Sequence, residues 1–142
     1  MMSLSLCSVQ MMMIILRSLS MKKFQIFKRI FFLVAFIVFI LAVIPAQKLP
    51  ELNLWDKSNH FIAFFVLTAL FIYAFKYKYH IAFIELLAYG VFIEIAQYFS
   101  INRSSEFLDV VADALGIITA IILIYLFRIL KTINYNSKVK IV

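Results

Sequence analysis

Apolar residues gather into four long stretches, separated by short segments that carry most of the charged residues. The stretches run over Ile30–Ala46, Ser58–Phe75, Tyr79–Phe99 and Val110–Phe127. About 20 apolar residues in a helix cross the hydrocarbon of a bilayer, and none of the stretches alternates residue by residue as barrel strands do. The pattern predicts an all-α, polytopic membrane protein built as a bundle of four transmembrane helices.

The amino-acid composition also indicates that most of the chain is surrounded by membrane lipid. The 142 residues are 65% hydrophobic and only 15% charged, which is too apolar for a water-soluble domain of this size. The single cysteine, Cys7, excludes an intramolecular disulfide. An ordinary soluble enzyme, a disordered chain and a disulfide scaffold are therefore excluded, and membrane lipids are the expected surroundings.

The net charge of +7 predicts how the protein is oriented in the membrane, because the basic residues are unevenly distributed along the chain. With four spans, all but three of the 14 Lys and Arg residues fall on one side, the exceptions being Lys48, Lys57 and Arg103. Basic residues favour the cytoplasmic side. We expect both termini in the cytoplasm of a bacterium, with the connections 47–58 and 99–107 outside its plasma membrane. Nothing forms a groove-reading basic helix, so no nucleic-acid partner is expected.

The chain divides into three segments. Residues 1–20 precede Met21-Lys22-Lys23, a typical start for a membrane protein, so we expect 1–20 to be a gene-model extension or a disordered tail. Residues 21–130 hold the four spans, and 131–142 form a basic cytoplasmic tail. A cleaved signal peptide is the alternative for the first span, but Ile44 is large where a cleavage site needs a small residue.

Polar residues interrupt spans two to four near their outer ends. The candidate ligand-binding residues are Asp56, Lys57, His60, Glu94, Gln97, Arg103, Asp109 and Asp113. Several pairs among them are three or four residues apart, which places each pair on one helix face. An ionised side chain in a bilayer costs about 2.5–3.5 kcal/mol on the mildest scale, so these residues should line a polar pocket that opens outward. Small residues below the pocket permit close helix packing: Gly90, Gly116 and Ala120.

Each candidate also has a plainer reading. Asp56 could cap a helix, and His60 could be a hydrogen-bonded interfacial residue instead of a proton relay. Arg103 suits a phosphate or carboxylate ligand, or neutralises a neighbouring acid. Glu94 is the most informative residue, because Asn or Gln would fill a purely structural role at lower desolvation cost. Glu85 lies about 180° around the same helix and is not assigned to the site.

Metal and cofactor sites are not expected. The chain has no H-E-x-x-H motif and no cysteine set, which are the strongest sequence signals for a protein-bound metal. A convergence of His60, Glu94, Asp109 and Asp113 is the one arrangement that could still hold an ion. The sequence therefore predicts neither metal nor cofactor.

The ordered pattern of these residues resembles the VanZ-like family of small membrane proteins. It reads Asp56-Lys57-x-x-His60-Phe61, then Glu94-x-x-Gln97-x-Phe99, Arg103, and Asp109-x-x-x-Asp113-x-x-Gly116. The family commonly has Asn where this chain has Asp113, and often Gly where it has Ala120. The first difference adds an ionisable group to the pocket, and the second is a small packing change.

The resemblance implies an integral membrane protein with an outward-facing polar site that affects the cell envelope. It allows an effect on glycopeptide or other envelope-drug susceptibility, although a fold does not carry a function with it. The leading hypothesis is binding or modulation of an envelope component, such as a lipid head group or a wall precursor. One alternative is an enzyme that uses paired carboxylates on a lipid-linked substrate, with unknown catalytic residues. Another is a structural or proton-conducting bundle.

Overall fold

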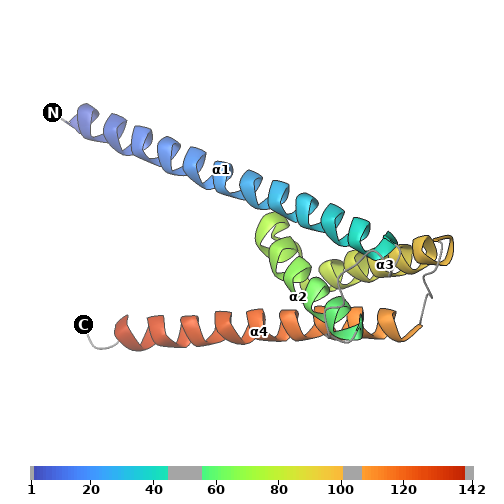
Figure 1. The fold of residues 1–142 in the computed structure, drawn as a ribbon. Helices are drawn as coiled ribbons and strands as arrows, with labels where there is room; N and C mark the ends of the chain where they lie inside the picture. Colours follow the sequence, from blue (N-terminus) through green and yellow to red (C-terminus); the bar gives the residue numbers. More distant parts are fainter. Residues whose placement is uncertain (1, 45–55, 101–106, 140–142) are drawn as a thin grey trace.

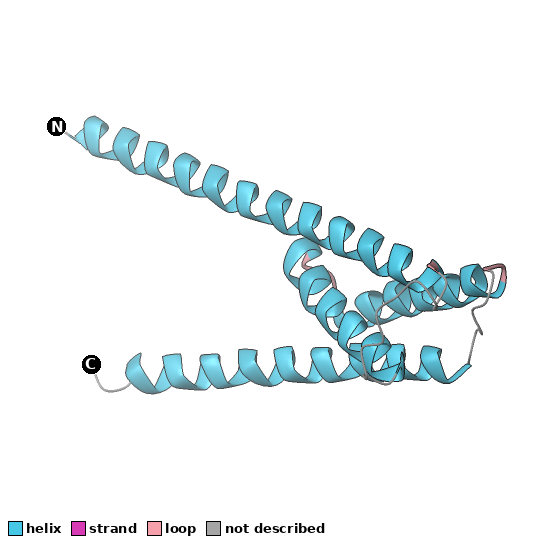
Figure 2. Ribbon diagram, viewed as in Figure 1, coloured by secondary structure: helices cyan, strands magenta, loops and turns pink. Residues whose placement is uncertain are grey.

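The structure is a computed structural model that describes residues 2–44, 56–100 and 107–139. These residues form four helices and no strand: α1 (Met2–Val43), α2 (Asp56–Phe75), α3 (Tyr79–Tyr98) and α4 (Phe107–Val139). Figure 2 shows helix over almost all of the part of the chain that is drawn in colour. The all-α prediction is confirmed over these residues.

All four helices are long and apolar enough to cross a membrane. The qualifying segments are Met11–Val43, Lys57–Phe75, Tyr79–Tyr98 and Phe107–Ser137. The predicted number of helices able to cross a membrane is confirmed over these residues, and the second and third segments begin and end within a residue of the predicted bounds.

The first and fourth helices are longer than their predicted spans. α1 contains no Gly or Pro, and α4 contains only Gly116, so nothing stops either helix at the edge of the hydrocarbon. At about 1.5 Å per residue both exceed the roughly 30 Å of a bilayer core. Residues 2–20 and 131–139 are therefore helical extensions of α1 and α4. The predicted translation start at Met21 stays a prediction.

Helix α2 lies at the centre of the bundle. It packs against α1, α3 and α4, and most extensively against α4, whereas α1 and α4 do not contact one another. Figure 1 shows α2 between α1 and α4, and both chain termini at the same end of the molecule. The core consists of large apolar side chains and contains Phe64, Leu67, Ile72, Leu86, Ile93 and Ile117.

Basic side chains and aromatic rings meet where α2 ends and α3 begins. Lys76, which has a left-handed backbone with φ of 55°, ends α2 and places its ammonium 3.8 Å from the centre of the Phe24 ring. Arg128 on α4 donates a hydrogen bond of 3.0 Å to the hydroxyl of Tyr79. The cation–π contact joins α1 to the end of α2, and the hydrogen bond joins α3 to α4, at one end of the bundle.

Candidate functional site

Three ionisable side chains from three helices converge at the other end of the bundle. His60 comes from α2, Glu94 from α3 and Asp109 from α4. One potential ligand atom from each lies within 4.8 Å of the other two, and all three side chains are buried. α2 and α4 begin here and α3 ends here, so the helix order alone brings these three distant segments together.

His60 is held in place by Asp113. His60 Nδ1 lies 3.0 Å from Asp113 Oδ1, and Asp113 has no exposed surface. In the tautomer that donates from Nδ1 to this carboxylate, Nε2 carries no hydrogen and is the ring nitrogen with a lone pair. The contact joins α2 to α4 across the interface and fixes the orientation of the ring.

Two glycines set the distances between the helices beside the site. A Cβ on Gly90 would lie 2.6 Å from Asp113 Oδ2 and 3.3 Å from the Phe64 ring. A Cβ on Gly116 would run into the backbone carbonyl of Phe61 on α2. Gly90 therefore makes room for the Asp113 carboxylate, while Gly116 lets two helix backbones approach directly.

Ala120 lies one helical turn beyond Gly116, and it is buried. Its small side chain lies on α4 toward the middle of the bundle, where it lines a hollow between α2 and α4.

Gln97 lies near the site but faces α1. Its Nε2 donates a hydrogen bond of 3.1 Å to the carbonyl of Ala42, and Ser100 Oγ donates one of 2.8 Å to the carbonyl of Val43. Carbonyls in the last turn of a helix have no partner within the helix. Gln97 and Ser100 thus cap α1 from α3, while the buried Gln97 Oε1 has no hydrogen-bond partner in the described part of the chain.

Other predicted site residues are only partly defined. Lys57 lies in the first turn of α2 and is half-buried. Asp56 is the first residue of that helix, but its side chain lies outside the described residues, as does all of Arg103. Glu85 is exposed on the surface of α3, and so the structure places it away from the buried cluster.

Two contacts that position the site were not predicted from the sequence. Ser100, just beyond α3, bonds to Val43 at the end of α1, and the Tyr89 hydroxyl on α3 donates a hydrogen bond of 2.6 Å to the carbonyl of Ala35 on α1. The only signal in the sequence is a hydroxyl within or beside an apolar span, which does not say which helix accepts the bond.

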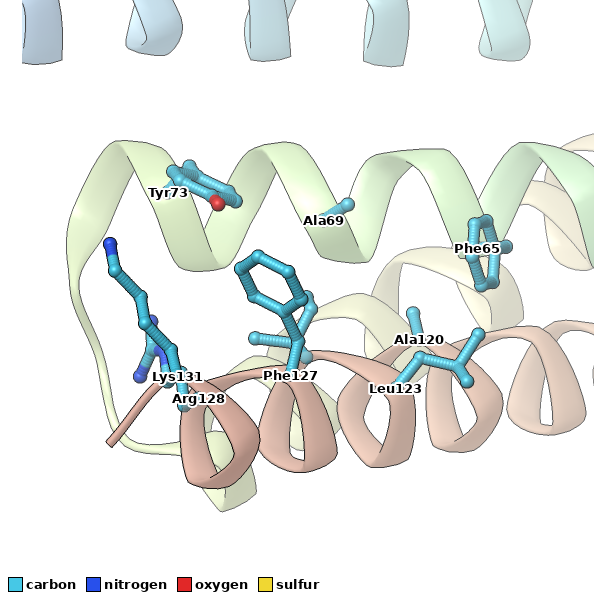
Figure 3. A pocket seen from close by; sticks show the side chains of 9 residues that line it. Phe65, Ala69, Tyr73, Ala120, Leu123, Phe127, Arg128 and Lys131 are labelled. Atoms are coloured by element: carbon cyan, nitrogen blue, oxygen red, sulfur yellow. The ribbon is translucent and has the colours of Figure 1, made fainter. Parts of the chain in front are cut away.

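A separate hollow of about 560 Å³ lies between α2 and α4, further along both helices. Its walls are mostly apolar and it ends at two basic side chains, as Figure 3 shows. The lining residues include Phe65, Ala69, Tyr73, Leu123, Arg128 and Lys131. Of the residues predicted from the sequence only Ala120 borders it, so the hollow and the ionisable cluster are different places.

The cluster offers an imidazole nitrogen and carboxylate oxygens in a buried setting. Such a set can bind a cation, accept hydrogen bonds from a polar ligand, or transfer protons. Two charged carboxylates this close repel one another, and a positive charge or a proton nearby relieves that repulsion.

Comparison with known proteins agrees with the pattern of residues. The VanZ/LLP1 family model matches residues 4–128, which include nearly all of α1, the whole of α2 and α3, most of α4 and the whole cluster. No curated protein and no solved structure matches the chain. The resemblance predicted from the ordered polar residues is confirmed, and the chain belongs to the VanZ/LLP1 family.

Proposed function

We propose that this membrane protein binds the polar part of a cell-envelope component through the cluster of His60, Glu94 and Asp109. The component is a lipid head group or a wall precursor, reached from the outer face of a bacterial plasma membrane. Binding would alter the response of the cell to glycopeptides and other envelope-directed drugs. The proposal treats the protein as a binding or modulating protein.

The observation that carries the proposal is the grouping of buried polar side chains at one end of an apolar bundle. Buried polar residues on the first turns of α2 and α4 and the last turns of α3 are His60, Glu94, Gln97, Asp109 and Asp113. Elsewhere in the described core the buried side chains are apolar, apart from Thr68, which bonds within its own helix. Polar groups are expensive within a membrane and mark functional sites by default.

Outward orientation follows from the charge distribution. The ends of α2 and α3 that carry Lys76 and Lys78 lie opposite the cluster, and basic residues favour the cytoplasmic side. The cluster then belongs to the outer half of the bilayer, where head groups and wall precursors carry phosphate and sugar groups. Its imidazole and carboxylates are matched to hydroxyl, amine or cation-bearing ligands.

A second function is favoured by the closeness of two acids. Glu94 and Asp109 each place an oxygen within 4.8 Å of the other, and paired carboxylates of this kind serve as acid and base in hydrolytic enzymes. An enzyme acting on a lipid-linked envelope substrate would use the same residues. Turnover of such a substrate by the purified protein would decide for this alternative.

The test replaces one carboxylate and keeps its shape. In a strain lacking the gene, Glu94→Gln should fail to restore the wild-type response to envelope-directed drugs, because it removes the charge at the centre of the cluster. Glu85→Gln makes the same chemical change on the exposed face of the same helix and should restore it fully. Immunoblots of membrane fractions must show equal amounts of the two variants.

Two results would count against binding. If deletion and overexpression leave every envelope-drug response unchanged, the proposed function loses its support. If Glu94→Gln restores the response as well as Glu85→Gln does, the cluster is structural, as expected for a bundle in which polar contacts only set helix packing.

A further inference from the structure

The structure points to a metal site in the same cluster, which neither the sequence motifs nor the family assigns. We infer that His60, Glu94 and Asp109 together bind one divalent transition-metal ion of the Zn²⁺ or Mn²⁺ class. The inference goes beyond the proposed function, since it concerns an ion held by the chain itself. It rests on four features of the cluster: the chemistry and spacing of the donors, the charge, the hydrogen bond behind the histidine, and the unsatisfied acceptors nearby.

The donors and their spacing suit such an ion. An imidazole nitrogen with two carboxylate oxygens is a borderline set, which Zn²⁺ and Mn²⁺ both accept. Donors held about 2.1 Å from one ion lie roughly 3–4 Å apart. The three atoms lie within 4.8 Å of one another, so small side-chain rotations bring them to one centre. They come from three helices, so an ion would also fasten α2, α3 and α4 to one another.

Charge gives the second argument. Glu94 is 8% exposed and Asp109 is 3% exposed, and two carboxylates buried side by side repel one another. Buried charges in proteins are paired or coordinate metals. A divalent ion carries enough charge to offset both acids and can bond directly to each of them.

The hydrogen bond behind His60 is the third argument. A histidine that binds a metal usually donates its other ring N–H to a carboxylate, which fixes the ring and raises its basicity. Asp113 occupies this position, with Oδ1 3.0 Å from His60 Nδ1. The ring nitrogen left for an ion is therefore Nε2.

The fourth argument is that buried hydrogen-bond acceptors near the cluster lack a donor. Asp113 Oδ2 and Gln97 Oε1 are buried and have no hydrogen-bond partner among the described residues. Asp113 is fully buried and already bonded to the candidate ligand His60. Buried acceptors without a donor call for water or an ion. A metal held by three side chains keeps coordination positions for water, and that water is a donor.

The experiment uses the full-length protein in detergent, stripped with a chelator and then given Zn²⁺ or Mn²⁺ alone. Bound metal is counted by mass spectrometry after desalting, and affinity is measured against a competing chelator. We expect one ion per chain, and at least tenfold weaker binding for Glu94→Gln and Asp109→Asn. Asp113→Ala should weaken it about 10–100-fold by loosening the histidine. Glu85→Gln should bind as the wild type does.

Several results would overturn the metal site. These are no ion retained by the wild type, or unchanged affinity in both Glu94→Gln and Asp109→Asn. Metal-free Glu94→Gln and Asp109→Asn should unfold at temperatures close to that of the metal-free wild type, and added metal should raise the unfolding temperature of the wild type and of Glu85→Gln but not of these two variants. The readout needs no envelope component, so failure here leaves the drug-response test of the proposed function standing, and failure there leaves the metal site standing.

Discussion

At the scale of single residues, the contact between Asp113 and His60 is the firmest feature of the site. Asp113→Ala leaves the buried His60 Nδ1 without an acceptor, so we expect the unfolding free energy to fall by about 1–3 kcal/mol. Asp113→Asn keeps an oxygen that can accept from Nδ1 and should fall by less. Thermal unfolding in detergent, in the absence of metal, measures both. Equal losses in the two variants would show that the hydrogen bond does not matter.

The sequence predicts the depth of the site residues in the bundle better than it predicts which of them form contacts. Helical period and span limits were enough to put His60, Glu94 and Asp109 at a common depth, because each lies a turn or two from a span end. Pairing was not predictable in the same way. Asp56 and His60 share a helix face, yet the described partner of His60 is Asp113 on α4. The faces that pack together depend on how each helix is rotated about its own axis, and that rotation cannot be derived from a single sequence.

At the scale of elements, the α2–α4 interface is set by Gly116. A methyl group there would meet the Phe61 carbonyl and lie 3.2 Å from Phe65 N, and backbone cannot move aside as a side chain can. Gly116→Ala should therefore force the helices apart and destabilise the protein by about 1–3 kcal/mol. The unfolding temperature in detergent measures this loss and should be lower for Gly116→Ala than for the wild type.

Gly90→Ala is the matched comparison, because its new methyl group would meet the Asp113 carboxylate, 2.6 Å away. A side-chain end can rotate, so stability should fall less than in Gly116→Ala. Metal affinity should instead drop, since Asp113 would be pushed off His60. A larger loss of stability in Gly90→Ala than in Gly116→Ala would contradict this assignment of the two glycines.

The elements themselves were predictable to different degrees. Spans two and three came out within a residue of their bounds, because the connections after Phe75 and Tyr98 change both charge and hydropathy there. The lengths of α1 and α4 were not predicted correctly, because an apolar run marks where a chain crosses the membrane and not where its helix ends. A helix ends at a breaker or cap. The first proline of the chain is Pro45, and α4 has none.

At the scale of the whole molecule, four spans place both termini on one side, as Figure 1 shows for the bundle. The charge distribution then predicts which side. Fluorescent protein fused after Val142 should be fluorescent, and alkaline phosphatase fused there should be inactive, because the distribution of basic residues predicts a cytoplasmic C-terminus. Phosphatase inserted in the connection at residues 47–55 should be active. The opposite pattern at both positions would show that the protein is inserted in the opposite orientation. The cluster of His60, Glu94 and Asp109 would then open to the cytoplasm, where wall precursors on the outer face cannot reach it.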